Sequence, residues 1–374
     1  MIYRRPFVDK KNLRRAFVRM DNLKPGMIVS EDVMLEFGTV LVPKGTKLTE
    51  RTLNRFRMLG IKGAYVFLPA SSLDNNEGES SEIIIEDDVP DEIVLERVYN
   101  NAHSVVKNTM ENVRSNGKID IAATMNVVEE IADKITNCTD VVRGLQELRK
   151  NSEYTYRHCV DVAILCGLMG RWLKLSDKNL RNLIHAGLLH DVGKAKIPLS
   201  ILNKPDKLND KEFAIIKNHP LYGYEIMSKS GYFDKSIYYA VLFHHEREDG
   251  SGYPFGLSGE SIPHISKIVA VMDTYDAMVS QRPYKGRYSP YYVIDVLQWN
   301  SIGKLDVNIV NVFISHIVDL FIGDRVKLSD GRVGRVVYLD KSLPTRPLVE
   351  LEDGSFVDLR EDYNLYIADI LLTV

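Results

Sequence analysis

The sequence has few cysteines and no CxxC pair. Its three cysteines, Cys138, Cys159 and Cys166, are odd in number and lack the spacing of a zinc finger. Reduced thiols are the expected state, which fits a cytoplasmic protein better than a disulfide-stabilised secreted one.

Long apolar runs and an excess of charge of one sign are also missing. No stretch is long enough to span a membrane, and no apolar segment follows Met1 that could act as a signal peptide. The net charge is only -3 and the basic residues are scattered, which argues against a large DNA or RNA surface. With 45% hydrophobic and 26% charged residues, the 374-residue chain is typical of a soluble protein of two or three domains.

The patterning divides the chain into four parts. Short strands and one helix predict a small α+β domain over residues 1–69, either a sensing and docking module or a packing domain. Residues 70–92 are rich in Ser, Asn and Gly and then acidic, which predicts a linker. Residues 93–322 have helical spacing of apolar residues, and residues 323–374 alternate like a small β-barrel of SH3-like size. We therefore expect a multi-domain fold whose central domain is all-α.

Individual elements can be placed within this division. In the first part, Thr49 and Gly60 would cap a short helix, residues 36–39 would form a hairpin turn, and residues 64–68 a strand. In the helical part, we expect one long helix from residue 93 to about Gly117, followed by helices over 121–135 and 141–148.

The helical part holds a set of side chains that are typical metal ligands. Five of the nine histidines and two aspartates fall on or at the ends of predicted helices: His158, His190, Asp191, His219, His244, His245 and Asp273. An aspartate with two oxygens can bridge two cations while histidines fill the remaining positions. The pattern predicts a dinuclear centre, with iron or manganese before zinc. The alternative is a helical bundle with unrelated histidines.

Several strings of residues carry a resemblance to a known family. His190-Asp191 matches an HD pair, and residues 244–254 read HHExxDGxGYP, ending in Gly252-Tyr253-Pro254. Residues 273–284 match a further D-x-x-D-A…R-P-Y segment. Residues 152–321 therefore resemble the HD-GYP family, a branch of the HD-domain metal phosphohydrolases.

The resemblance implies a fold of packed helices and a phosphodiesterase that opens cyclic di-GMP, or a related cyclic dinucleotide, to pGpG and in some members to GMP. It also implies that one metal lies among His158, His190, Asp191 and Asp273. Asp191 would bridge to a second metal, held by His219, His244 and His245. Some members hold a third metal through a glutamate, but that position here is Tyr154 and the nearby Glu153 is one residue off. We therefore predict two metals.

The chemistry expected of such a site assigns further residues. We hypothesise that a hydroxide bridging two cations attacks phosphorus, with Asp191 and Lys194 as the catalytic residues. Lys194 and Arg282 would contact phosphate oxygens unless they form salt bridges on the bundle surface. Tyr253 would bind the phosphate or stack near a guanine, and Asp249 would brace the Gly-rich turn or orient a ligand histidine. No general acid can be identified.

Other polar residues are expected to be structural. His103, His185, His264 and His316 match no ligand position, and Asp276 would cap or brace a helix. Two rival functions remain open. One is a signalling scaffold that binds a cyclic dinucleotide with little turnover, and the other is a phosphohydrolase of another nucleotide. A homodimer is compatible with the sequence.

Overall fold

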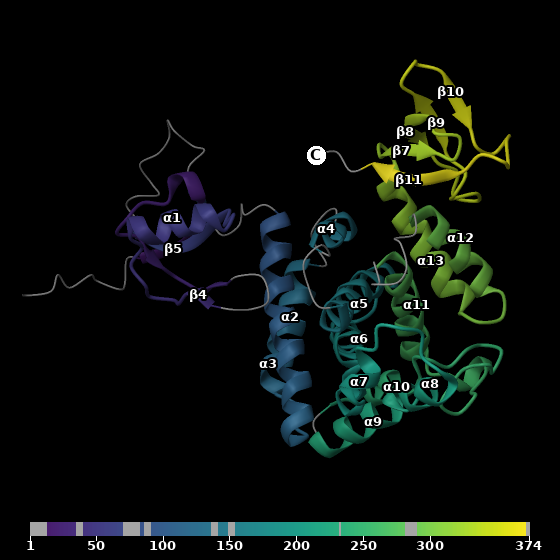
Figure 1. The fold of residues 1–374 in the computed structure, drawn as a ribbon, viewed down its shortest axis with the longest axis horizontal. Helices are drawn as coiled ribbons and strands as arrows, with labels where there is room; N and C mark the ends of the chain where they lie inside the picture. Colours follow the sequence, from purple (N-terminus) through teal and green to yellow (C-terminus); the bar gives the residue numbers. More distant parts are fainter. Residues whose placement is uncertain are drawn as a thin grey trace, which may run out of the picture. The chain divides into compact units, whose positions relative to one another are not determined.

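The computed structural model describes residues 13–34, 40–69, 83–85, 91–135, 141–148, 154–231, 233–280 and 290–371. The chain divides into two compact units, Met1–Asn100 and Asn101–Val374 (Figure 1). Within the described ranges, no helix combines the length and the apolar character needed to cross a membrane.

The first unit contains a small antiparallel sheet, helix α1 (Glu50–Met58) and the beginning of a long helix that continues into the second unit. Its sheet has the order β2-β5-β1-β6, and a separate pair joins β3 and β4. The strands are β1 (Leu13–Arg19), β2 (Ile28–Val29), β3 (Val33–Met34), β4 (Val40–Val42), β5 (Gly63–Pro69) and β6 (Ile83–Ile85). Helix α1 (Glu50–Met58) begins after Thr49, whose hydroxyl accepts a hydrogen bond from Thr52 N at 3.2 Å. Leu53 and Phe56 point into the core, so the predicted helix and its cap are confirmed.

Two strands of this unit were not expected. β1 pairs with β5 along its whole length, although its sequence contains three arginines. β6 pairs with β1, so part of the stretch predicted to be a linker is an ordered edge strand. The hairpin turn predicted at residues 36–39 lies outside the described residues.

The second unit is built from helices and ends in a sheet. The long helix α2 (Asp91–Asn116) begins two residues before its predicted start at residue 93 and runs from the first unit into the second. The next helices are α3 (Ile121–Glu130), which continues as a π-helical turn at Ile131–Ile135, and α4 (Val141–Leu148), as predicted. The helices that follow are α5 (Tyr154–Trp172), α6 (Asp177–Leu189), η7 (Val192–Lys196), α7 (Leu199–Leu202), α8 (Asp210–Ile216), α9 (His219–Ser230), α10 (Lys235–Phe243), α11 (His264–Val279), α12 (Pro290–Ser301) and α13 (Val307–Ile317).

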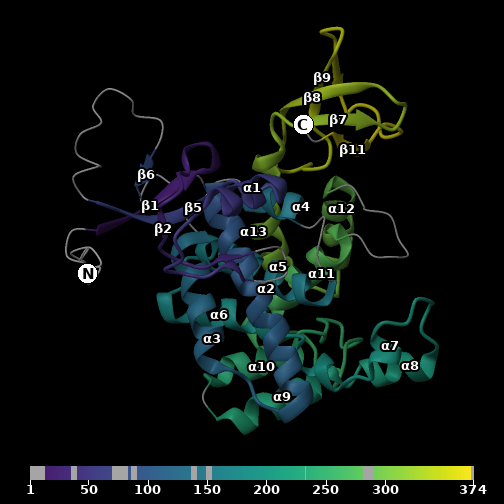
Figure 2. The same ribbon diagram turned by 60° about the vertical axis from the view of Figure 1, so that its left-hand side comes forward.

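Five of these helices pack around one another. α5 contacts α6 and α11, and α10 contacts α6, α9 and α11 (Figures 1 and 2). Small residues set two of the closest approaches. A Cβ atom on Gly187 of α6 would lie 2.9 Å from Ala163 Cα of α5, and one on Gly193 would lie 1.9 Å from the carbonyl oxygen of His219. Glycine at both positions therefore lets the neighbouring backbones come together.

The two described cysteines support this packing. Cys159 and Cys166 are buried free thiols on α5. Burial is the main cause that raises the pKa of both thiols above the usual value. Cys138 lies outside the described residues.

The chain ends in a five-stranded antiparallel sheet of order β10-β9-β8-β7-β11. Its strands are β7 (Arg325–Leu328), β8 (Val333–Tyr338), β9 (Leu348–Leu351), β10 (Phe356–Asp358) and β11 (Ile367–Leu371). Buried and exposed residues alternate along β7, β8 and β9, as expected for strands with one covered face. The predicted β-region is confirmed, while its closure into a barrel stays a prediction.

Candidate metal centre

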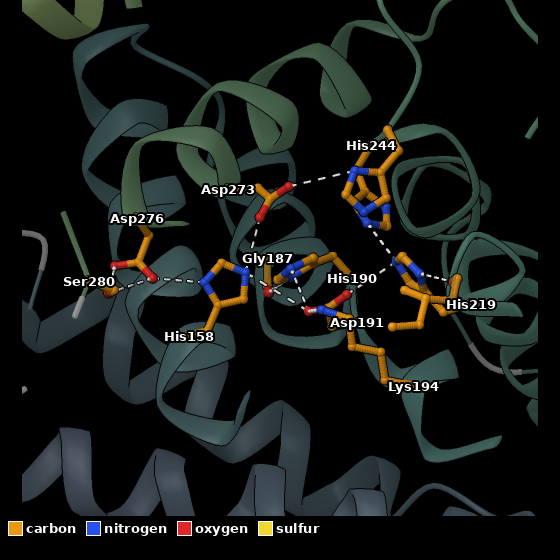
Figure 3. A network of polar contacts seen from close by, with 12 residues as sticks. His158, Gly187, His190, Asp191, Lys194, His219, His244, Asp273, Asp276 and Ser280 are labelled. Carbon is orange, nitrogen blue, oxygen red and sulfur yellow. Dashed lines mark hydrogen bonds and ion pairs between the residues drawn. The ribbon is translucent and has the colours of Figure 1, made fainter. Parts of the chain in front are cut away.

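All seven residues predicted to bind metal come together in the helical unit. Figure 3 labels each of them except His245. They fall into two groups, and within each group one ligand atom from every residue lies within 4.8 Å of the others. The first group contains His158, His190 and Asp273, and the second contains Asp191, His219, His244 and His245. Five different helices or helix ends supply these side chains, so the tertiary fold creates the clusters.

Asp191, a member of the second group, also faces the histidines of the first group. Its Oδ2 atom is 3.4 Å from His190 Nε2 and 3.9 Å from His158 Nε2. Its Oδ1 atom is 3.2 Å from His219 Nε2. Each oxygen of this buried carboxylate therefore faces a different group, which is the arrangement that a bridging carboxylate needs.

Helix ends orient three of the histidines. Each directs its Nδ1 atom at the carbonyl oxygen three residues earlier: His190 to Gly187 at 2.7 Å, His219 to Ile216 at 2.8 Å and His244 to Val241 at 2.9 Å. The last carbonyls of a helix have no partner within the helix, so a following histidine can satisfy one of them. A carbonyl oxygen only accepts, so Nδ1 carries the proton. In the neutral ring, Nε2 then offers its lone pair to the centre.

His158 is oriented by a second carboxylate. Its Nδ1 atom lies 2.7 Å from Asp276 Oδ2, and its Nε2 atom lies 3.0 Å from Asp273 Oδ1. Asp276 is fully buried and also accepts a hydrogen bond from Ser280 Oγ at 3.2 Å. Asp276 therefore braces its own helix, as predicted, and in addition it holds a ligand histidine, which was not predicted. Its spacing from Asp273 places both carboxylates on one face of α11, and this was the available signal.

The groups fit a divalent cation better than an empty protein interior. Nε2 of His219 lies 3.3 Å from Nε2 of His244. His190 Nε2 is buried without a hydrogen bond to any described residue. Burial, together with the neighbouring histidines, lowers the pKa of His244 and His245 well below the usual value, so these rings are neutral. Lone pairs that face one another in a buried site are unfavourable unless a cation lies between them, and imidazole with carboxylate suits transition metals.

The carboxylates of the centre stay ionised. Burial alone would raise the pKa of Asp191, but Lys194 and His190 outweigh it, so the pKa lies well below the usual value. Burial would also raise the pKa of Asp273. The opposing effects are stronger, the hydrogen bond with His158 being the largest of them, and they hold this pKa well below the usual value. Two buried anions at neutral pH provide the negative charge that metal cations require.

Two of the three residues predicted to contact substrate lie at this centre. Lys194 Nζ forms an ion pair with Asp191 Oδ2, and 21% of its side chain remains exposed. The Tyr253 ring stacks on His245, with the centroids 4.6 Å apart and the planes at 26°. Burial, followed by the charges of Asp191 and Asp273, raises the pKa of Tyr253, so it remains a neutral phenol. Arg282 lies outside the described residues, as does Glu153.

The turn that carries Tyr253 is fastened by Glu246, for which no role was predicted. This carboxylate is only 2% exposed and accepts hydrogen bonds from the backbone N–H groups of Phe255 at 2.8 Å and Leu257 at 2.9 Å. Tyr253 N also donates to the carbonyl of His245 at 3.2 Å. Asp249 accepts from the backbone and hydroxyl of Ser251, so it braces the turn, the first of its two predicted roles.

Three of the other histidines, His103, His185 and His316, pack against neighbouring side chains, and His264 is exposed at the start of α11. His185 is buried, with Nε2 at 3.1 Å from Thr124 Oγ1, and burial lowers its pKa to about 4. His103 is buried as well, and the His316 ring stacks on Trp172 with centroids 4.7 Å apart. None of them belongs to the two ligand groups found among the described residues.

Comparison with known proteins identifies the fold of this centre. Residues 131–309 match the model of the HD domain family. This part of the chain is an HD domain. The HD domain predicted from His190-Asp191 is thereby confirmed for this part of the chain. An HD domain implies binding of divalent metals, and the clustered histidines and aspartates are groups that could hold them.

Several curated proteins that are similar to this chain are named as phosphodiesterases of cyclic dinucleotides. Cyclic di-GMP phosphodiesterase PA4108 of Pseudomonas aeruginosa is 36% identical over 237 residues, which are 63% of this chain and 57% of the relative. The cyclic di-GMP phosphodiesterase response regulator RpfG of Xanthomonas campestris is 48% identical over 122 residues, 32% of each chain. The 3'3'-cGAMP-specific phosphodiesterase 1 of Vibrio cholerae is 36% identical over 170 residues, 44% of this chain and 38% of the relative. The chain thus spans between 32% and 57% of the length of these relatives.

Proposed function

We propose that the HD domain protein is a metal-dependent phosphodiesterase that hydrolyses cyclic di-GMP to pGpG, with GMP as a candidate second product. One observation carries the proposal. The two oxygens of buried Asp191 face two separate sets of imidazoles, so a pair of cations could share this carboxylate. The curated relatives that act on cyclic di-GMP support the choice of substrate.

The metals would be held by His158, His190 and Asp273 on one side and by His219, His244 and His245 on the other, with Asp191 between them. When bound, a pair of divalent cations offsets the charge of a phosphodiester and lowers the pKa of water towards 7.

The chain's own residues would prepare this chemistry. Asp276 fixes the direction of the His158 ring. Lys194 keeps Asp191 ionised and has an exposed portion that could reach a phosphate oxygen. The Tyr253 ring stacks on His245 and would border the bound substrate. Arg282 remains a predicted substrate contact.

We propose iron as the natural metal, with manganese as an alternative. The ligand set is rich in imidazole and contains carboxylates but no thiolate, a composition that suits both ions. Elemental analysis of protein purified without oxygen would test this choice. Zinc as the dominant metal would contradict it.

The decisive assay is hydrolysis of cyclic di-GMP by anaerobically purified protein loaded with iron or manganese. Formation of pGpG is expected, and it should be lost in Asp191→Ala and retained in Asp353→Ala, a matched aspartate variant in an exposed turn of the C-terminal sheet. The substrate panel should include 3'3'-cGAMP, because one relative is specific for it. Binding of cyclic di-GMP without any product would instead favour a signalling scaffold.

We also propose roles for the flanking regions. Residues 1–69 would sense a signal or dock a partner, and residues 323–374 would close into a small barrel that contacts a partner. Each region has its own sheet, which supports an independent role. Deletion of residues 1–69 should alter regulation while the isolated HD domain keeps its bound metals.

A further inference from the structure

A cluster of two aromatic rings and a lysine lies beside the metal-ligand groups. It consists of Phe213 on α8, Lys217 just after α8, and Tyr253. Lys217 Nζ is 4.9 Å from the centroid of the Phe213 ring and 5.4 Å from the centroid of the Tyr253 ring. A cation at this distance from an aromatic face is attracted to it, so the three side chains form one unit.

The cluster leads from the metal-ligand groups to solvent. Tyr253 stacks on His245 and its ring centroid is 6.5 Å from that of His219, so it borders the second ligand group. Tyr253 is half-buried, whereas Lys217 is exposed and Phe213 is 47% exposed. An aromatic side chain and an ammonium group are therefore presented together at the solvent side of the centre.

Helix α8 holds Phe213 in place. Asn209 caps the helix by accepting from Glu212 N at 2.9 Å, and the Glu212 carboxylate returns the bond by accepting from Asn209 N at 2.8 Å. Lys204 pairs with the same carboxylate at 2.7 Å. This capping box fixes the first turn, where Phe213 lies. Because the Phe213 side chain is already ordered, less conformational entropy is lost when a ligand stacks on it.

We propose that Phe213 and Lys217 form a subsite for a purine base of the cyclic dinucleotide substrate. The base would stack on the Phe213 ring, and Lys217 would donate to acceptors on the base edge, such as O6 and N7 of guanine. The identity of the ligand rests on the proposed function, which places the phosphodiester at the metals next to Tyr253. The subsite would thereby make recognition of the base separate from hydrolysis of the phosphodiester.

The test measures binding without turnover. The probe is a bisphosphorothioate analogue of cyclic di-GMP, titrated into metal-loaded full-length protein. Phe213→Ala and Lys217→Met should each weaken binding about tenfold, since stacking on one aromatic ring and one cation contact contribute at this level. Metal content should stay that of the unaltered protein, because neither side chain belongs to the ligand groups.

Two matched variants serve as controls. Ile215→Ala removes another exposed apolar side chain of α8, 37% exposed, which points away from Phe213 because two residues turn a helix by about 200°. Lys211→Met removes another exposed lysine of the same helix. Both should bind the analogue as the unaltered protein does.

The outcomes separate the subsite from the proposed function. If cyclic di-GMP is not hydrolysed but the analogue binds and loses affinity in Phe213→Ala and Lys217→Met, the function fails and the subsite stands. Equal affinity in these variants and in the controls would overturn the subsite, even if hydrolysis is observed. Absence of measurable binding to the unaltered protein would overturn it as well.

Discussion

The buried His185 should make the helical unit sensitive to acid. This side chain is 6% exposed on α6, its Nε2 atom lies 3.1 Å from Thr124 Oγ1, and the Phe233 ring contacts it edge-on at 5.0 Å. Burial lowers its pKa from 6.5 to about 4. The folded protein therefore keeps His185 neutral over a pH range in which the unfolded chain binds a proton.

The size and sign of the effect follow from this difference in pKa. Above pH 6.5 the imidazole is neutral in both states and contributes nothing to the pH dependence. As the pH falls from 6.5 towards 4, only the unfolded chain takes up the proton, so the free energy of unfolding decreases. Each pKa unit corresponds to about 1.4 kcal/mol, so the full loss is about 3 kcal/mol.

The assay compares the protein with His185→Gln, which cannot titrate. Urea unfolding is followed by fluorescence of the two tryptophans, Trp172 and Trp299, because both belong to the helical unit. Acid also releases bound metal, but it does so in both proteins, so the difference between them isolates His185. The stability of the unaltered protein should fall by about 3 kcal/mol more than that of the variant as the pH is lowered to 4. Parallel stability curves over this range would refute the reasoning.

Three further substitutions test the supports of the centre. Asp276→Asn should weaken binding of one metal by about 10- to 100-fold, because His158 loses its carboxylate partner. Titration against a chelator would measure the affinities of both metals, and no change in either would contradict this prediction. Glu246→Gln should lower the free energy of unfolding by about 1–3 kcal/mol, because the amide that replaces one carboxylate oxygen cannot accept from its backbone N–H group. Equal stability of the variant in urea would argue that Glu246 does not fasten the turn. Gly193→Ala should lower the free energy of unfolding by at least about 1–3 kcal/mol and reduce the metal content, since the added Cβ would lie 1.9 Å from the carbonyl oxygen of His219. A variant with normal stability and metal content would exclude this close approach of the two backbones.

The clustering of these histidines and aspartates was predictable from the sequence because the chemistry of a metal site restricts the residue types. Five histidines and two aspartates recur within one helical region, and the strings around His190 and His244 indicate which of them belong together. The helices were predictable for a different reason, since apolar residues at helical spacing mark a buried face, as along α3 and α4.

The parts that were missed depend on contacts between distant segments. Asp276 meets His158 across 118 residues, and no local pattern shows that partner. β6 is a strand because it pairs with β1, although its neighbours in sequence are acidic. Glu246 is close in sequence to its partners, but a carboxylate that points inward to bind two backbone N–H groups looks like any surface glutamate.

We propose that Asp191 joins two metal-binding groups, and the metal content of the protein measures this most directly. Protein purified and analysed without oxygen should contain two divalent ions per chain, one for each ligand group. Asp191→Ala should lose both ions and the hydrolysis of cyclic di-GMP together, because both groups use this carboxylate. A variant that keeps two ions and full turnover would contradict the account.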